Sequence, residues 1–194
     1  MSPEQLLSIL SVAARLKTTP RHCTTAPGRT ESVAEHSWRL ALMAMLLGDC
    51  DEFASYDMDR VTRMCLIHDL GEAFTGDIPT FLKTQRDADT EDGLFDRWVD
   101  GFPEPTRARW RSLLDEMNAQ QTNEAKLYKA LDKLEAVISH NESDIDTWLP
   151  LEYDLQFTHG RELVAFSPTL TALKAAIDRQ TEEKIRTEAK PKGE

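Results

Sequence analysis

The sequence MCLIHDLGEAFTGDIPT, residues 64–80, concentrates an imidazole and several carboxylates in one mostly apolar stretch. Its apolar start predicts a helix with His68 and Asp69 side by side in the middle. Glu72 follows one turn later on the same face, because an α-helix turns once in 3.6 residues. A Thr-Gly pair predicts the end of this helix, and Asp77 comes just after it. Burying unpartnered carboxylates is costly, so the pattern favours a divalent cation as their partner.

Two other predicted helices carry polar residues beside an apolar stripe. Residues 32–35, Ser-Val-Ala-Glu, have the pattern of a capping box and predict a helix from there to about residue 48. A long helix is predicted from residue 123 to about 143. With the first stretch, these helices supply two imidazoles and two carboxylates: His36, His68, Asp69 and Asp132. This donor set suits one divalent ion (Mn²⁺, Co²⁺, Fe²⁺, Zn²⁺ or Mg²⁺) and leaves coordination positions for water or a phosphate oxygen.

Composition limits the possible partners and locations of the chain. Its 194 residues are 40% hydrophobic and 29% charged, which is typical of one globular domain. The net charge of −11 repels a phosphate backbone, so we expect no nucleic-acid polymer as a partner. Cys23, Cys50 and Cys65 are odd in number and lack a CxxC spacing, which favours the reducing cytoplasm. The sequence shows neither a signal-peptide pattern nor an apolar run long enough for a membrane span.

Apolar residues recur at helical spacing along most of the chain. We therefore expect one all-α domain over residues 1–186, a bundle of about six to eight helices. Further helices are predicted over residues 3–17, 94–101, 103–117 and 169–186. Polar composition predicts surface loops at residues 18–30 and 81–93, and an irregular segment at 148–168. The charged residues 187–194 are expected to form a flexible tail.

The order of the four ligand candidates resembles the signature of the HD-domain phosphohydrolases. Three segments extend the resemblance to the 5′-deoxynucleotidases of that family: RTESVAEHS (29–37), HDLGEAFTGDIPT (68–80) and KALDKLEAVI (129–138). A lone His-Asp pair is weak evidence, whereas the pair followed by Glu and Gly-Asp-x-Pro, with these flanking segments, is specific. The resemblance covers roughly residues 5–180 in order and spacing.

The resemblance implies a helical HD fold and hydrolysis of nucleoside 5′-monophosphates, with deoxyribonucleotides preferred. It implies one divalent metal held by the four candidates above. It assigns Glu72 to activating or positioning the attacking water, and Asp77 to the substrate side of the pocket. It also implies a homodimer, because such relatives are dimers, although no stripe in the sequence identifies the interface.

The resemblance also concerns two residues of the predicted loop 18–30. Arg21 stands where the family has a phosphate-binding arginine. The family places a tryptophan directly after it, close to the sugar, whereas this chain has His22. A smaller, polar ring there leaves both ribonucleotides and deoxyribonucleotides open as substrates.

Each candidate residue also has a purely structural interpretation. Taken alone, His36 is typical of a core histidine, and Glu72 of a salt bridge. Asp132 could pair with Lys129 or Lys133 as a helix surface charge. Asp77 is equally compatible with a turn, and Arg21 with an exposed surface position. Five other polar residues are expected to be surface charges, a cap or structural histidines: Arg29, Lys83, Glu35, His140 and His159.

Three classes of function remain open at this point. The first is hydrolysis of nucleoside monophosphates. The second is another HD chemistry, such as a two-metal oxygenase, a cyclic-nucleotide phosphodiesterase or a guanosine tetraphosphate hydrolase. No histidine lies between residues 69 and 132, which disfavours a second fully liganded metal. The third is a non-catalytic partner-binding domain, against which the clustering of ionisable residues argues.

Overall fold

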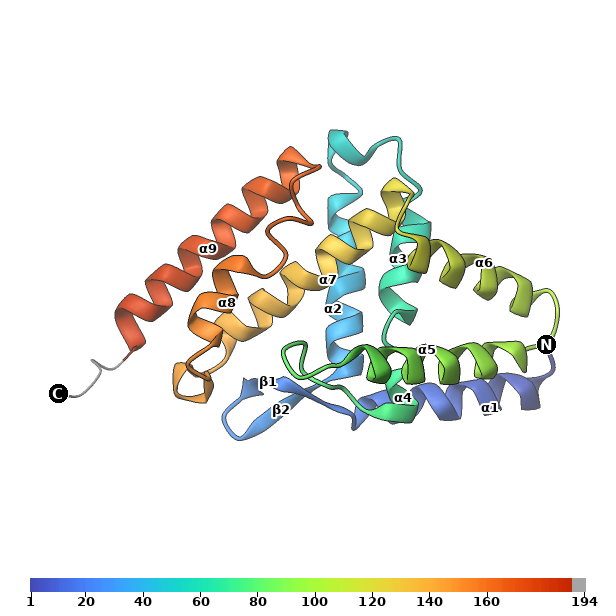
Figure 1. The fold of residues 1–194 in the computed structure, drawn as a ribbon. Coiled ribbons are helices and arrows are strands. Elements are labelled where there is room, and N and C mark those ends of the chain that lie inside the picture. The colour runs from blue at the N-terminus through green and yellow to red at the C-terminus, as the bar shows by residue number, and fades with distance from the viewer. Residues whose placement is uncertain (190–194) are drawn as a thin grey trace.

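The computed structural model describes residues 1–189 and confirms the all-α prediction. Figure 1 shows α2, α3 and α7 at the centre, with α8 and α9 on one side and α1, α4, α5 and α6 on the other. The helices are α1 (Pro3–Ala13), α2 (Val33–Leu47), α3 (Met58–Ile67), α4 (Glu72–Thr75), α5 (Gln85–Asp100), α6 (Thr106–Ala119), α7 (Asn123–Glu142), α8 (Glu152–Thr158) and α9 (Pro168–Glu188). Short 3₁₀ helices are η1 (Ala14–Lys17), η2 (Asp51–Phe53) and η3 (Ile145–Thr147). None of the helices in residues 1–189 could cross a membrane, given their length and polarity.

The core lies where α2, α3 and α7 meet. Helix α7 buries the predicted stripe of Leu127, Leu131 and Leu134 without any exposed surface. Leu40 of α2 and Met64 of α3 are equally buried against it. Because these side chains recur every three or four residues, one face of each helix is mostly apolar. Polar residues buried at this junction therefore come from rigid, closely packed elements.

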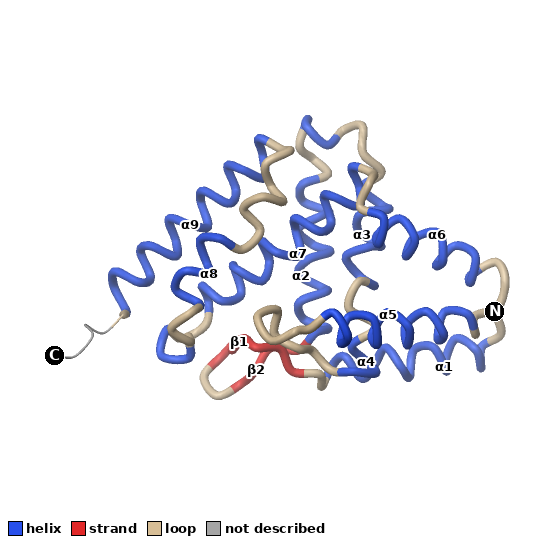
Figure 2. Tube along the Cα trace, viewed as in Figure 1, coloured by secondary structure: helices blue, strands red, loops and turns tan. Residues whose placement is uncertain are grey.

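A β-hairpin replaces the predicted loop over residues 18–30, so that prediction was wrong. Strand β1 (Pro20–Ala26) pairs antiparallel with β2 (Arg29–Ser32), as Figure 2 shows. The turn between them contains Gly28 with φ of 73°, which glycine adopts without strain. The hairpin is tied to α7, because Ser143 Oγ accepts from Thr24 N at 3.2 Å and donates to Thr24 O at 2.8 Å. Its polar strands gave no apolar alternation from which a sheet could be predicted.

The central stretch is two helices rather than the single helix predicted. Helix α3 ends at Ile67, and from Leu70 onward backbone N–H groups bond three residues back: Leu70 N to Ile67 O at 3.1 Å and Glu72 N to Asp69 O at 3.0 Å. These are 3₁₀-type bonds, which tighten the chain before α4 begins. His68 and Asp69 therefore occupy a turn at the end of α3. The expected close approach at Gly71 is confirmed, since a Cβ there would meet Glu91 Cγ at 2.8 Å.

Helix α5 begins inside the predicted loop 81–93, so that prediction was wrong for most of the segment. The helix expected at 94–101 is present as the second half of α5, which begins nine residues earlier than predicted. Thr84 forms a capping box with Asp87: Thr84 Oγ1 accepts from Asp87 N at 3.3 Å, and the Asp87 carboxylate accepts from Thr84 N at 2.9 Å. This cap stabilises a polar first turn that carries little apolar periodicity. The segment 148–168 likewise contains α8.

At the other end of the chain, α9 extends through Glu188. Of the predicted charged tail, residues 190–194 lie outside the described part of the chain.

Candidate metal centre

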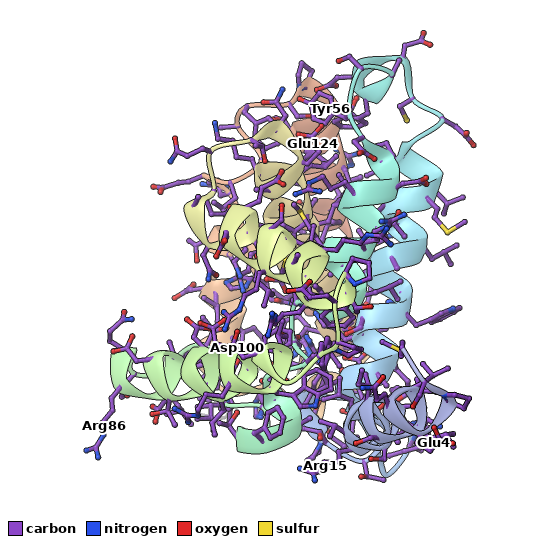
Figure 3. The ribbon with its side chains drawn as sticks, turned by 90° about the vertical axis from the view of Figure 1, so that its right-hand side faces the viewer. Glu4, Arg15, Tyr56, Arg86, Asp100 and Glu124 are labelled. Carbon is purple, nitrogen blue, oxygen red and sulfur yellow. The ribbon has the colours of Figure 1, made fainter. Side chains whose placement is uncertain are left out.

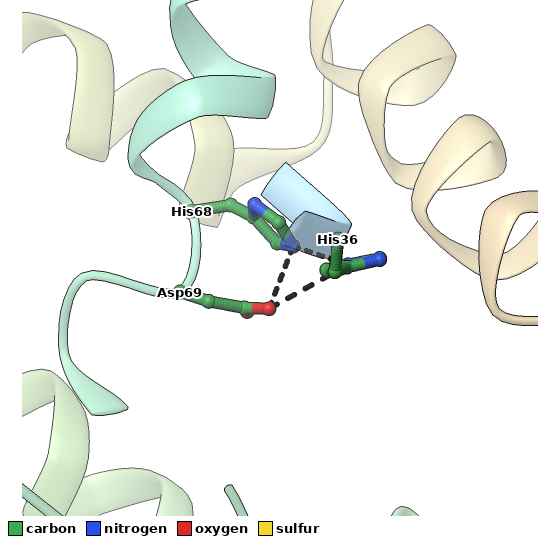
Figure 4. Close-up of side chains that lie close together, drawn as sticks. All are labelled: His36, His68 and Asp69. Atoms are coloured by element: carbon green, nitrogen blue, oxygen red, sulfur yellow. Dashed lines mark hydrogen bonds and ion pairs between the residues drawn. The ribbon is translucent and has the colours of Figure 1, made fainter. Parts of the chain in front are cut away.

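Two imidazoles and a carboxylate converge at the end of α3. His36 projects from the first turn of α2, and its Nε2 lies 3.2 Å from His68 Nε2. Asp69 Oδ2 lies 2.9 Å from His68 Nε2 and 3.6 Å from His36 Nε2 (Figure 4). The ligand atoms of these three side chains are all within 4.8 Å of one another. The three residues come from two segments of the sequence, and the packing of α2 on α3 brings His36 to the His68–Asp69 pair.

Hydrogen bonds to the far ring nitrogens orient both imidazoles. His68 Nδ1 donates to Cys65 O at 2.9 Å, and His36 Nδ1 bonds Glu135 Oε2. When both rings are neutral, each carries its lone pair on Nε2, and the two lone pairs face each other. This repulsion is relieved by a cation between them. Two ligands about 2.1 Å from one ion, at angles of about 90–110°, lie about 3.0–3.4 Å apart, which brackets the observed separation.

Asp132 approaches the same point from α7. Its Oδ1 lies 3.4 Å from His36 Nε2 and 3.7 Å from His68 Nε2. Its Oδ2 pairs with Lys129 Nζ at 3.1 Å and with Lys133 Nζ at 3.0 Å. The pairing with Lys129 and Lys133 is present, but Asp132 is buried rather than a helix surface charge. Its other oxygen faces the imidazoles, and ligation of a metal by Asp132 stays a prediction.

The electrostatics of the cluster fit a cation. Burial works to lower the pKa of His68, but the Asp69 and Asp132 carboxylates outweigh it and raise the pKa to about 10. Burial also raises the pKa of Glu72, reinforced by the charges of Asp69 and Asp77, to about 10. Glu72 Oε2 is buried and has no hydrogen-bond partner within residues 1–189. Donor types, spacing and this unpartnered oxygen together fit a divalent ion at His36, His68 and Asp69, while Asp132 as a fourth ligand stays a prediction.

A buried network behind His36 was not predicted from the sequence. Glu135 has no exposed surface and accepts from Arg39 Nε at 2.6 Å. Ser139 Oγ lies 3.1 Å from Glu135 Oε1 and 2.9 Å from Glu31 Oε1. The sequence signal was the position of Glu135, three residues after Asp132 and hence on a neighbouring face of the same helix. The partnership with His36 depends on helix packing and has no local signature.

A cavity of about 460 Å³ opens beside the metal cluster. Arg21, Glu72, Asp77, Asp69 and Asp132 all line it. The Arg21 guanidinium is bound at Nε by Glu31 Oε2 at 3.1 Å, and its Nη1 lies 4.0 Å from Asp69 Oδ2. Burial raises the pKa of Asp77, while the charge of Arg21 and the backbone N–H of His22 oppose the rise. The predicted substrate and catalytic residues thus share one cavity, while their roles stay predictions.

The far wall of the cavity holds a second group of histidines. His22 Nε2 lies 3.1 Å from Glu152 Oε1, and His140 Nε2 lies 3.2 Å from Glu152 Oε2. His140 also stacks on Trp148 with ring centroids 4.7 Å apart. Glu152 had no motif to mark it and was not predicted. Lys83, expected on the surface, also lines the cavity and pairs with Glu91 at 2.8 Å.

The chain is similar to known proteins in sequence and in fold. A family model described as an HD domain matches residues 13–174. The human protein named 5′-deoxynucleotidase HDDC2 is 32% identical over 145 residues, which are 71% of this chain and 67% of that protein. Escherichia coli 5′-deoxynucleotidase YfbR is 31% identical over 130 residues, 62% of this chain and 65% of the relative. A crystal structure from Magnetospirillum magnetotacticum, described as a predicted metal-dependent phosphohydrolase, has a TM-score of 0.76 and 29% identity and covers 93% of both chains.

Proposed function

Because the chain belongs to the HD domain family, we propose that it is a metal-dependent phosphohydrolase that releases phosphate from nucleoside 5′-monophosphates. One observation carries the proposal. His36, His68, Asp69 and Asp132 converge beside a cavity of about 460 Å³ that is also lined by Arg21 and Glu72. Hydrolysis of a phosphomonoester by a metal-dependent enzyme uses three kinds of group: metal ligands, a cation that binds the phosphate, and a carboxylate that acts on the attacking water. Here these are the four ligand candidates, the Arg21 guanidinium and the buried Glu72.

Each cavity residue has a task in this reaction. A divalent ion held by the four ligands supplies charge to polarise the phosphoryl group and to acidify a water. Arg21 binds the phosphate oxygens through its guanidinium, which is held in place by Glu31. A cation bound beside it would offset the carboxylate charges that raise the pKa of Glu72, so that the ionised Glu72 can orient the attacking water and take its proton; its buried Oε2 has no partner within residues 1–189. Asp77 lies on the substrate side and helps to protonate the departing 5′-oxygen.

We further propose that the enzyme accepts both ribose and deoxyribose nucleotides. Arg21 and His22 both line the cavity, so a sugar joined to a phosphate at Arg21 would lie near the His22 ring. His22 and Glu152 make this wall hydrogen-bonding rather than apolar. A wall of this kind accommodates a 2′-hydroxyl that an apolar wall would leave without a partner.

Phosphate release from a substrate panel tests the function. The panel contains dAMP, dGMP, dTMP, AMP and a phosphodiester, each with Mn²⁺ or Co²⁺, and inorganic phosphate is measured by malachite green. We expect turnover of the monophosphates with AMP within about tenfold of dAMP. The matched control is Asp69→Asn, which keeps the side-chain shape but removes a ligand charge. No release from any monophosphate with either metal would refute the proposal.

We also propose that two copies form a homodimer through apolar surface on α1 and α2. Helix α1 buries none of its own residues, and Leu7 is 66% exposed; Trp38 of α2 is 63% exposed. Figure 3 shows α1 at the foot of the molecule, near the labelled Glu4. Just beyond α1, the guanidinium carbon of Arg15 lies over the Phe74 ring, 5.8 Å from its centroid. A second copy that covers these side chains would bury this apolar surface. Light scattering of the wild type and of Leu7→Glu measures whether the dimer depends on α1.

The three cysteines are free thiols, and we assign the protein to the cytoplasm on that basis.

A further inference from the structure

Lys129 and Lys133 flank Asp132 one turn apart on α7. Both ammonium groups reach the same oxygen, Oδ2, at 3.1 and 3.0 Å, while Oδ1 faces the imidazoles of the metal cluster. An ammonium has three N–H donors, and the Asp132 carboxylate occupies one on each lysine. Each lysine therefore keeps donors for a further anion.

The two lysines border the cavity on the side of α7, and Arg21 borders it from β1. The metal cluster is thus flanked by two ammoniums from one element and a guanidinium from another. Lys83 also lines the cavity, but it pairs with Glu91 at 2.8 Å. In a chain with a net charge of −11, this local set of cations is what can draw a phosphate into the cavity.

We propose that Lys129 and Lys133 together bind the phosphate dianion and make the enzyme select phosphomonoesters over phosphodiesters. The inference rests on the proposed function and specifies its substrate class. A monoester has a second pKa of about 6 and so carries nearly two charges at pH 7.5, whereas a diester carries one. Two ammoniums that share one carboxylate favour the more highly charged group. A second ester substituent would also replace one of the oxygens that they contact.

A merely structural role makes a different prediction. If the lysines only neutralise Asp132, their removal changes how Asp132 binds a cation, and monoesters and diesters lose activity alike. If they bind phosphate, their removal weakens phosphate affinity and leaves cation affinity in place. Metal affinity, phosphate affinity and the monoester-to-diester ratio are therefore three separate readouts.

The variants are Lys133→Met, Lys129→Met and the double substitution. Lys126→Met is the matched control, because Lys126 lies exposed on the same helix and does not line the cavity. Calorimetry measures binding of inorganic phosphate to the Mn²⁺-loaded protein and, separately, binding of Mn²⁺. Steady-state kinetics compare dAMP with bis(p-nitrophenyl) phosphate. Lys133→Arg, which keeps the charge, guards against loss of folding.

We expect each methionine variant to weaken inorganic phosphate binding about tenfold or more, which is the scale of a charge-assisted hydrogen bond. The ratio of kcat/KM for dAMP over the diester should fall by a similar factor, with no loss of Mn²⁺ affinity, because the variants remove positive charge beside Asp132, and with partial recovery in Lys133→Arg. Unchanged phosphate affinity, or an equal loss of Mn²⁺ affinity, overturns the proposal. If the wild type hydrolyses no nucleotide, the proposed function fails, while phosphate calorimetry still tests the lysines.

Discussion

Two clusters of histidine and carboxylate line the same cavity, and their imidazoles are arranged in opposite ways. His36 and His68 point their Nε2 atoms at one another, 3.2 Å apart. His22 Nε2 and His140 Nε2 instead lie beside opposite oxygens of Glu152, at 3.1 and 3.2 Å. In the first cluster two like nitrogen atoms meet, which favours a proton or a metal ion between them. In the second an anion already lies between the rings, so composition alone does not identify a metal site.

The two clusters also differ in how firmly they are held. His36 is fully buried, and Glu135 behind it is fully buried as well. The second cluster joins β1, α7 and α8, and the side chain of His22 is 40% exposed to the cavity. A rigid, buried cluster suits chemistry that needs fixed geometry, whereas a more exposed one suits contact with a substrate. Under the proposed function, we therefore expect catalysis at the first cluster and recognition at the second.

The sharpest way to break this comparison is to remove one histidine from each cluster. His68→Asn should reduce kcat/KM about 1000-fold or more, because it removes a metal ligand worth several kcal/mol. His140→Asn should leave kcat/KM within about tenfold and lower the melting temperature, since its stacking on Trp148 is lost. Phosphate release and thermal unfolding measure both variants. Equal losses of activity would mean that the clusters do not have separate roles.

A smaller effect is expected from the carboxylates that hold the histidines. Glu135→Gln should weaken Mn²⁺ binding about 10–100-fold, the usual effect of removing a partner that orients a ligand. Glu152→Gln is the matched control, because it changes the same group in the second cluster. Calorimetric titration of Mn²⁺ measures both, and Glu152→Gln should match the wild type. An effect of Glu152→Gln as large as that of Glu135→Gln would place both carboxylates behind one metal site.

Features that depend on residues close together in the sequence could be predicted from it, whereas features that depend on contacts between distant elements could not. The stripe of Leu127, Leu131 and Leu134 repeats within one helix, so local periodicity was enough. A short sequence motif identified the His68–Asp69 pair, but nothing in the sequence predicted that the pair would lie in a turn. Glu152 contacts residues of other elements, His22 and His140, and the sequence around Glu152 does not indicate these partners.

Two missed elements show the same limit. The β-hairpin at residues 20–32 is polar on both strands and is held by Ser143 of α7. The start of α5 depends on the Thr84 cap and on the approach of Glu91 to Gly71. Both elements depend on hydrogen bonds and close contacts, which cannot be predicted from a pattern of hydrophobic residues.

The mildest test follows the pH dependence of stability. Asp69 and Asp132 overcome the effect of burial and raise the pKa of His68 from 6.5 to about 10, so the folded chain retains a proton that the unfolded chain releases. The stabilisation from this proton is complete below about pH 6.5 and declines as pH rises toward 10. A metal ion competes with the same proton and binds more tightly as pH rises.

Thermal unfolding at pH 6.0 and 8.5, with EDTA or with Mn²⁺, therefore separates proton from metal. At about 100-fold excess over Kd, Mn²⁺ should raise the melting temperature by about 5–10 °C, from a stabilisation of about 2.7 kcal/mol. At a fixed low Mn²⁺ concentration the increment should be larger at pH 8.5, where fewer protons compete. His68→Asn should lose the pH trend and most of the increment, while Glu152→Gln keeps both. An increment that shrinks as pH rises would show that Mn²⁺ binds away from the imidazoles, and the convergent cluster would lose its distinction from the bridged one.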